Sequence, residues 1–598
     1  AIEPNGSRVP LDEIQHAGNW QAKDGMLYAT QAGGSAARWS GKATSLQVVL
    51  LSHPWSGRAV VRWNGESREI DLHKETPGNA TTSISLLGDA HPNLWMTFPD
   101  RTALQRAVQL LDAMLIAFVL YVLQLRLVGV ARIPVDEHGS MLVQSIRYAL
   151  PSWTVSACLL LVFWPGLMSN DSVAQWRDAA TGVSSDWHPV YHTLFIALAR
   201  AIWDSPSFIA MLQAGALGLS TGWLIAVIEK VARTPKSVSH LASWCCGLMP
   251  IIAFSSISLW KDVPYAASVV AITAGSLSVL LLGKPRLSHP LPFAATLAIL
   301  LVCILFRHNG PPLAATALAM VFLLSKANRK AVAVLALVAI GAAVLLKGPV
   351  SDALGVKRSN VAFGLYAHHI AAHLEAGDSL PSPAAQTLFR QVVTDRATWP
   401  YSCGSVDATI FNPAFDRSVA AAHSSELRDA WLDLARSHPV TEFRHLACVS
   451  SLVWLMDESG QPPLYEFGVN VYPIDGQLNW VQNGSGLEEA SMTPRLAISI
   501  GEWLEGAKKF NILWRPAGWL YLLLFATWVA SRRMRDWRIA TLCIPILAHS
   551  AVLALANVAQ DVRYQLPVFI ISLACVPALL VSRPGSTTAP APPLGWDA

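Results

Sequence analysis

The sequence has little charge for its length. Asp, Glu, Lys and Arg make up only 14% of its 598 residues, and the formal net charge is +4. Its Lys and Arg lie in short clusters between apolar runs, so the chain lacks the basic surface that a polyanion requires, and we predict no nucleic-acid partner. Hydrophobic residues make up 53% of the chain and the mean hydropathy is +0.38, which predicts a membrane protein.

Cysteines are few and lack metal-binding spacing. The eight cysteines form no CxxC pair and no Cys and His pattern typical of zinc. Six lie in apolar runs, where a thiol behaves as a small hydrophobic group: Cys158, Cys245, Cys246, Cys303, Cys543 and Cys575. Only Cys403 and Cys448 lie in a long polar region, and we expect them to pair if that region is outside the cytoplasm.

The sequence starts AIEP, without a methionine or a basic and apolar leader. If the first hundred residues are exported, we expect that a signal peptide or an earlier membrane helix has been removed. Residues 1–100 contain the strand-like segments LQVVLLSH, RAVVRW and REIDLH, and Asn64-Gly65 is the dipeptide of a type I′ hairpin turn. We predict a β-sandwich-like domain. Its tryptophans (Trp20, Trp39, Trp55 and Trp63) suit a buried core, the commoner role, or stacking on sugars.

Beyond residue 100, apolar runs long enough to span a bilayer dominate the chain. We predict about eleven transmembrane helices, near 107–130, 150–169, 206–228, 240–259, 264–282, 290–306, 311–325, 331–346, 511–531, 538–557 and 565–582. The predicted fold is therefore a polytopic α-helical membrane protein. A membrane core at 101–346 precedes an α-rich insertion at 347–509, C-terminal membrane helices at 510–583 and a disordered, Pro-rich tail at 584–598. In the insertion, QTLFRQVVTDRA and SSELRDAWLDLARSHP are expected to be amphipathic helices, the second capped by Ser424 or Ser425.

Lys and Arg in the short loops predict the orientation. Five basic loops would all be cytoplasmic if the β domain is outside and the chain crosses eleven times: Arg132 and Arg147; Lys230, Arg233 and Lys236; Lys284 and Arg286; Lys326, Arg329 and Lys330; and Arg532, Arg533, Arg535 and Arg538. The short run 192–203 then cannot cross, and we expect it at the outer interface. The predicted location is the bacterial cytoplasmic membrane, with the tail inside.

Four turns on the predicted outer side combine acidic and basic residues. SNDSVAQWRDAATGVSSDWHP carries Asp171, Asp186 and His188, after the second predicted span. The turns SLWKDVPY, FRHNGPP and AQDVRYQLP carry Lys261 and Asp262, Arg307 and His308, and Arg563 and Tyr564. Charges at a helix end often serve as anchors, but anchoring needs neither carboxylates nor histidines, so we favour a shared site.

This combination predicts group transfer from a lipid phosphate. A carboxylate at the interface can act as general base on an acceptor hydroxyl. Cations at the same depth can hold a phosphate and stabilise it as a leaving group. A lipid-linked substrate would present its phosphate at this depth, with its tail in the membrane lipid.

At these residues the sequence resembles the GT-C superfamily of integral-membrane glycosyltransferases, which use polyprenyl-phosphate-linked sugars. SND with Asp171 matches the acidic residue of their first catalytic loop, and DWHPVYH resembles the histidine-proline element that ends it in several branches. Together with SLWKD and RHNG, the match covers roughly 155–310 and is similar to a bacterial branch, with weaker support from VRYQLP. The resemblance implies that Asp171 is the catalytic base and that His188 positions donor or acceptor, with Asp186 as the competing base. It also implies that Lys261, Arg307 and Arg563 contact the phosphate. We predict that Asp262, His308 and Tyr564, their neighbours in the same turns, are substrate-binding residues as well.

The late insertion and the β domain depart from the better-known protein-glycosylating branches. The identity of the acceptor therefore stays open between an envelope glycan, a lipid and a protein. No metal site or cofactor is certain, although some branches use a divalent metal. The spacing from His369 to His373, with His368 beside them, suits a metal, but a solvated helix face is the commoner explanation.

Two other functions stay open. An O-antigen ligase or polymerase also uses external arginines and histidines, but the early acidic loop favours the glycosyltransferase. A transporter of lipid-linked glycans would have charges near the bilayer midplane and inverted repeats, whereas these charges lie at the outer helix ends.

Overall fold

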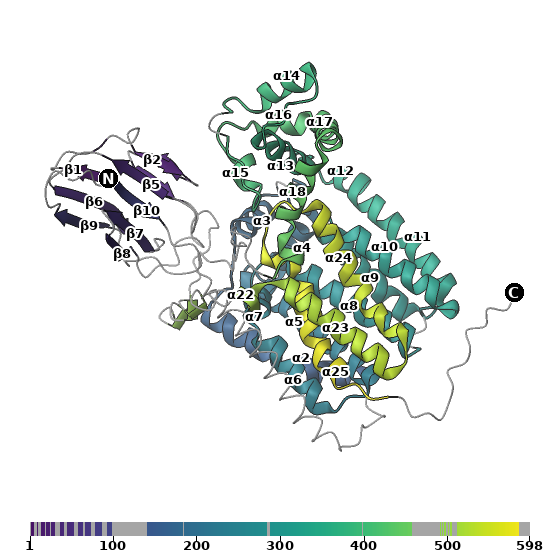
Figure 1. The fold of residues 1–598 in the computed structure, drawn as a ribbon. Coiled ribbons are helices and arrows are strands. Elements are labelled where there is room, and N and C mark those ends of the chain that lie inside the picture. Colours follow the sequence, from purple (N-terminus) through teal and green to yellow (C-terminus); the bar gives the residue numbers. More distant parts are fainter. Residues whose placement is uncertain are drawn as a thin grey trace. The chain divides into compact units, whose positions relative to one another are not determined.

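A computed structural model describes the strands between residues 2 and 97, residues 140–456 except 183–184, 284–286 and 397–398, some positions from 491 to 504, and residues 511–584. The chain divides into two compact units, Ala1–Ala117 and Phe118–Ala598 (Figure 1). The predicted span at 107–130, the tail after 584 and the side chains of the four N-terminal tryptophans lie outside what is described.

The first unit is built from short antiparallel strands, as predicted. The three segments expected as strands become β6 (Ser45–Ser52), β7 (Arg58–Trp63) and β8 (Glu66–Asp71). Because Trp63 pairs with Glu66, the chain reverses within two residues, as a tight hairpin requires, although Asn64 and Gly65 lie outside the described residues. The other strands are β1 (Ile2–Pro4), β2 (Gln15–Ala17), β3 (Trp20–Lys23), β4 (Met26–Ala29), β5 (Ala36–Ser40), β9 (Gly78–Ser85) and β10 (Asn93–Thr97).

These strands form sheets in the orders β1-β6-β9 and β2-β5-β10-β7-β8, with β3 and β4 as a separate pair. Val48 of the first sheet and Val61 of the second are fully buried, so each sheet contributes to an apolar core.

The second unit contains the membrane helices. Six helical segments among the described residues are long and apolar enough to cross a membrane, which makes the chain a multi-pass helical membrane protein. They are α2 (Met141–Val162), α5 (Pro206–Ala232), α8 (Asp262–Leu281), the continuous segment Lys326–Ala353 that contains α11 (Arg329–Leu345), Trp537–Ala556 with α24 (Cys543–Ala556), and Val562–Leu580 with η6 (Val562–Gln565) and α25 (Leu566–Leu580).

The predicted number of eleven spans is not reached by these helices. α6 (Lys236–Leu248) and α7 (Pro250–Ser256) pass the test only as a pair, bent by 64° where Pro250 starts a new helix. The helices α9 (Pro290–Phe306) and α10 (Gly310–Leu324) are apolar but short, and α23 (Pro516–Met534) is not among the candidates. The run at 192–203 forms α4 (Val190–Ile202), whose 13 residues are too short to cross a core of roughly 30 Å, as predicted.

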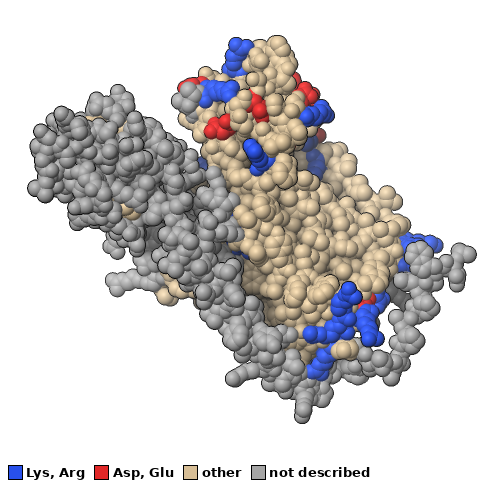
Figure 2. Space-filling model, in the orientation of Figure 1, with Lys and Arg blue, Asp and Glu red and all other residues tan. Residues whose placement is uncertain are grey.

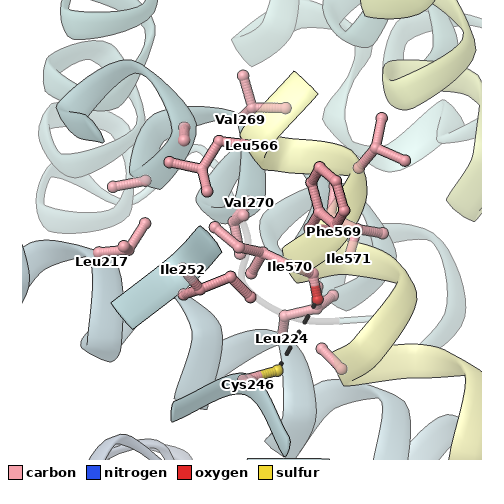
Figure 3. Close-up of a cluster of buried hydrophobic side chains, with 14 of the residues drawn as sticks. Leu217, Leu224, Cys246, Ile252, Val269, Val270, Leu566, Phe569, Ile570 and Ile571 are labelled. Atoms are coloured by element: carbon pink, nitrogen blue, oxygen red, sulfur yellow. Dashed lines mark hydrogen bonds between the residues drawn. The ribbon is translucent and has the colours of Figure 1, made fainter. Parts of the chain in front are cut away.

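Helices α5, α8 and α25 form the centre of the bundle, where their apolar side chains pack together (Figure 3). Val270 and Ile570 are fully buried there, and the Cys246 thiol of α6 lies 4.0 Å from the Ile570 carbonyl oxygen. α2 packs closely on α5 because Gly222 has no side chain: a Cβ atom there would lie 2.1 Å from the Ser145 carbonyl oxygen. Close helix contact through a small residue is common in membrane bundles.

The insertion is a small helical domain, as predicted, composed of α13 (Ala362–Glu375), α14 (Pro383–Val392), α15 (Asp407–Ile410), α16 (Arg417–Ala422), α17 (Ser424–Ser437), α18 (Pro439–Val449) and α19 (Ser451–Trp454). The two expected amphipathic helices are α14 and α17, but α17 is capped by His423 rather than by Ser424 or Ser425, because the helix starts one residue earlier. The expected disulfide between Cys403 and Cys448 is present.

Charged residues are unevenly distributed over the second unit. In the view of Figure 2, the middle of the bundle has few charges, the helical domain carries both signs, and Lys and Arg gather at the opposite end. The helical domain is joined to the bundle by isolated bridges, which pair Ser185 with Lys357 and Ser405 with Ala559.

Candidate functional site

The predicted catalytic loop is fixed by hydrogen bonds to the turn that contains Lys261. α3 (Asn170–Thr181) starts directly after this loop's first serine, Ser169, whose hydroxyl accepts a 2.9 Å hydrogen bond from the Trp260 indole. The Ser172 hydroxyl donates to the Leu259 carbonyl oxygen at 2.7 Å. Together these bonds put Asp171, in the first turn of α3, beside Lys261.

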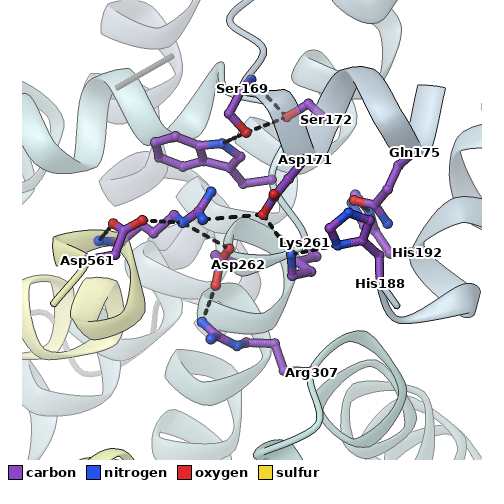
Figure 4. Close-up of polar contacts among 12 residues, drawn as sticks. Ser169, Asp171, Ser172, Gln175, His188, His192, Lys261, Asp262, Arg307 and Asp561 are labelled. Carbon is purple, nitrogen blue, oxygen red and sulfur yellow. Dashed lines mark hydrogen bonds and ion pairs between the residues drawn. The ribbon is translucent and has the colours of Figure 1, made fainter. Parts of the chain in front are cut away.

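Two cations hold the Asp171 carboxylate. Its Oδ2 atom lies 3.2 Å from Lys261 Nζ and 3.3 Å from Arg563 Nη2 (Figure 4). Burial alone would raise the pKa of this carboxyl, but Lys261, Arg563 and His188 outweigh it and hold the pKa well below its usual range. Asp171 is therefore ionised at neutral pH, and its side chain is still 34% exposed, so a ligand can reach it.

A second, deeper carboxylate completes the network. Asp262, in the first turn of α8, is only 2% exposed and forms an ion pair with Arg307. The helix dipole also favours a negative charge at this position. The Arg563 Nε atom lies 2.7 Å from Asp561 and 3.9 Å from Asp262. We call the group Asp171, Lys261, Asp262, Arg307 and Arg563 the ion cluster.

Aromatic rings orient the two guanidinium groups. Arg307 lies 4.5 Å from the centre of the Tyr564 ring, and Arg563 lies 5.2 Å from that of Trp260. Such cation–π contacts stabilise an arginine without neutralising it. The guanidinium groups are thus held in place and keep their charge.

The two predicted histidines are close to this network. His188 Nδ1 lies 3.4 Å from Lys261 Nζ, and burial and the Lys261 charge lower the pKa of His188 to about 4. His308 follows Arg307, and burial, Lys347 and Lys261 lower its pKa to about 4. Both imidazoles are neutral at pH 7, so Nδ1 of His188 can accept a hydrogen bond from the Lys261 ammonium.

Asp186 is engaged elsewhere. Its carboxylate accepts a hydrogen bond from the Ser359 backbone N–H, and its own N–H donates to the Lys357 carbonyl oxygen at 3.0 Å. These bonds tie the end of the loop to the start of the helical domain. The geometry therefore favours a positioning role for Asp186 and ranks it below Asp171 as a site carboxylate.

The expectation that His368, His369 and His373 lie on a solvated helix face is wrong. All three are fully buried because α13 packs its histidine face against α18. Glu442 contacts His369 Nδ1 at 2.9 Å and His373 Nε2 at 3.2 Å. We call His368, His369, His373, Glu442 and His445 the histidine cluster.

A divalent metal does not fit the residues present. Within the described parts of the chain, no three His, Cys, Asp or Glu residues are grouped so that they could hold a metal ion. In the ion cluster, Lys261 and Arg563 contact Oδ2 of Asp171 and Arg307 contacts Oδ1 of Asp262, so both carboxylates already have cationic partners. We derive no step through a metal.

The sequence predicted a shared site for residues from four different turns, and the structure places five of them in one network: Asp171, Lys261, Asp262, Arg307 and Arg563. Sequence reasoning missed the structural role of Trp260 and did not select Asp561, although both stand inside quoted motifs next to selected residues. It also missed Asp407, which has no local signal because it lies in the insertion. The whole chain matches no protein-family model, no curated protein and no solved structure.

Proposed function

We propose that this protein is an integral-membrane glycosyltransferase. It moves a sugar from a polyprenyl-phosphate donor to an extracytoplasmic acceptor, which is an envelope glycan, a lipid or a protein. The observation that carries the proposal is the ion cluster at one end of the membrane helices, with an accessible Asp171 held by Lys261 and Arg563. Such a cluster suits a lipid phosphate, because arginine and lysine bind phosphate oxygens and the membrane lies beside them.

The charge distribution supports an extracytoplasmic site. Lys and Arg gather at the end of the bundle away from the helical domain (Figure 2), and cytoplasmic loops carry an excess of these residues. The disulfide between Cys403 and Cys448 agrees, because such bonds persist outside the reducing cytoplasm. The eleven crossings predicted from the sequence would put the β domain and the helical domain on the outer side of a bacterial cytoplasmic membrane.

An apolar groove beside the site suits the lipid tail. It has a volume of about 540 Å³ and is lined by residues of α4, α5, α8 and α9, including Phe195, Pro264 and Phe306. Pro264 lies in the first turn of α8, as Asp262 does, and Phe306 directly precedes Arg307, so one end of the groove is at the end of α8 and α9 that carries the ion cluster. A phosphate bound by the ion cluster can therefore extend its polyprenyl chain into the groove and the bilayer.

The cluster stabilises charge that develops during transfer. When the bond between sugar and phosphate breaks, the lipid phosphate gains a negative charge, which lysine and arginine groups fixed in advance can stabilise. Held by Trp260 and Tyr564, the guanidinium groups need little reorganisation. An Asp carboxylate acts as general base on the acceptor hydroxyl, with Asp171 as the candidate from the sequence.

The test uses purified protein in lipid vesicles with a panel of polyprenyl-phosphate sugars and an envelope extract of the host as acceptor. We expect release of polyprenyl phosphate with at least one donor, and at least about a 100-fold slower release for Asp171→Asn. The matched control is Asp178→Asn, which changes the same residue type farther along α3 and is expected to retain activity. Absence of binding and turnover of every donor by the wild type, or full activity of Asp171→Asn, would overturn the proposal.

A further inference from the structure

Asp407 of the helical domain is brought to the site by backbone pairing. The Val406 N–H donates to the Val558 carbonyl oxygen at 2.8 Å, and the Gln560 N–H donates to the Gly404 carbonyl oxygen at 2.8 Å. The segment that ends in Asp407 is thus joined to the segment that leads directly to Arg563.

The predicted catalytic loop holds the same segment from the other side. Trp187, the residue before His188, packs against Phe411, which follows α15, with 6.1 Å between ring centres. Trp187 also packs at 6.1 Å against Phe363 of α13. Because Asp407 is the first residue of α15, the loop that bears His188 and the turn that bears Arg563 both fix its position.

The two carboxylates on this side of the site differ in their surroundings. Asp171 has two cations within 3.3 Å, whereas no ion pair among the described residues includes Asp407, which is exposed. Protein atoms around Asp407 raise its pKa above the ordinary 3.8. The Ser405 hydrogen bond and Arg563 oppose that shift, and the Asp171 charge adds to it. Asp171 is therefore a weak proton acceptor, and Asp407 is the stronger base.

We propose that Asp407 is the catalytic residue that binds the acceptor hydroxyl and takes its proton, while Asp171 holds the phosphate-binding cations in place. This inference rests on the proposed function. The acceptor oxygen forms a bond to the sugar's anomeric carbon, and its proton moves to the Asp407 carboxylate. The bond between that carbon and the phosphate oxygen breaks, and its electron pair stays on the polyprenyl phosphate. Asp407 then releases the proton to water.

The arrangement explains why the helical domain takes part in the reaction. The membrane helices supply the cations for a donor, and the helical domain supplies the group that faces an acceptor. The chemical class of acceptor is one with a nucleophilic hydroxyl, because a carboxylate base activates that group.

The experiment measures donor binding and transfer separately in lipid vesicles, with a polyprenyl-phosphate sugar as probe and the host envelope extract as acceptor. For Asp407→Asn we expect a loss of transfer of about 100-fold or more, with donor affinity within about threefold of wild type. Asp407→Glu should recover part of the rate. Asp429→Asn, on exposed α17, is the control and should behave as wild type.

The pH profile provides a second readout. Wild-type transfer should fall in acid as Asp407 takes up a proton, at a higher pH than Asp171 would titrate, because its surroundings raise the pKa of Asp407 and the neighbouring cations lower that of Asp171. Arg563 stays charged throughout, and Asp407→Asn should lack this acid limb. Normal donor binding with unchanged transfer in Asp407→Asn would overturn the inference alone. A wild-type protein that binds no polyprenyl-phosphate sugar would overturn the proposed function and this inference with it.

Discussion

The ion cluster and the histidine cluster are both networks of charged and polar side chains, but they are built in opposite ways. In the ion cluster, turns distant in the sequence bring cations around Asp171, which is 34% exposed. In the histidine cluster, two neighbouring helices enclose Glu442, which is 12% exposed, among fully buried histidines. The ion cluster contains cations and is accessible to a ligand, as a binding site needs. The histidine cluster is closed and stabilises the fold.

The largest effect on stability is expected where the closed network is broken. Glu442→Gln removes the carboxylate that contacts both His369 and His373, and the loss of one partner of a buried ion pair costs about 3–5 kcal/mol. We expect a marked decrease in the thermal unfolding midpoint, measured in detergent. Glu426→Gln, on exposed α17, is the control. If Glu442→Gln and Glu426→Gln are equally stable, Glu442 has no structural role.

The same kind of change in the ion cluster should affect turnover instead. Lys261→Gln is expected to slow transfer by about 10²–10³-fold, or about 2.7–4 kcal/mol, because the leaving phosphate loses a fixed positive charge. Lys261→Arg keeps the charge and should retain more activity than the Gln variant. The rates are measured by release of polyprenyl phosphate. If both variants keep the wild-type rate, Lys261 has no part in transfer.

Stability should depend on pH with an acid limb and an alkaline limb. Burial lowers the pKa of His445 to about 2 and that of His368 to about 4, so their contribution is lost as pH falls below the ordinary 6.5. Burial also opposes the charge of His373, but Glu442 and Asp378 outweigh it and raise its pKa, so its contribution is lost as pH rises through that raised value. Unfolding midpoints across pH measure both limbs. His373→Gln should remove the alkaline limb. If the alkaline limb persists in this variant, another group causes it.

The smallest effect is expected at Asp186. In Asp186→Asn, the amide oxygen can still accept the hydrogen bond from the Ser359 N–H, so we expect changes of about 0.5 kcal/mol or less and roughly a twofold change in transfer rate. Unfolding midpoints and rates are measured as above. A decrease of 100-fold in rate would make Asp186 a candidate base, against the assignment of that role to Asp407, and would contradict its rank below Asp171 as a site carboxylate.

The sequence predicted what depends on local pattern. Apolar runs marked the membrane helices, Asn64-Gly65 marked the β7–β8 hairpin, and charged turns at helix ends marked the ion cluster. What it missed depends on tertiary contacts. The face of α13 that carries His369 is buried because α18 brings Glu442 and α17 brings Trp431 against it. Asp407 meets the site through pairing across more than 150 residues of sequence. The break before Pro250 was missed because the apolar run predicted at 240–259 continues through it.

The disulfide gives the turn that carries Arg563 a covalent support. Gln560 is fully buried, its N–H bonds to the carbonyl oxygen of Gly404, next to Cys403, and its side-chain amide donates to the Cys448 carbonyl oxygen at 2.7 Å. Both sides of the Cys403–Cys448 bond therefore hold one residue, three positions before Arg563. Under the proposed function the helical domain is outside the cytoplasm, where thiols are oxidised, so a newly made chain would acquire this support only after export. Maturation of the proposed phosphate site would thereby be coupled to the compartment in which the substrate is used.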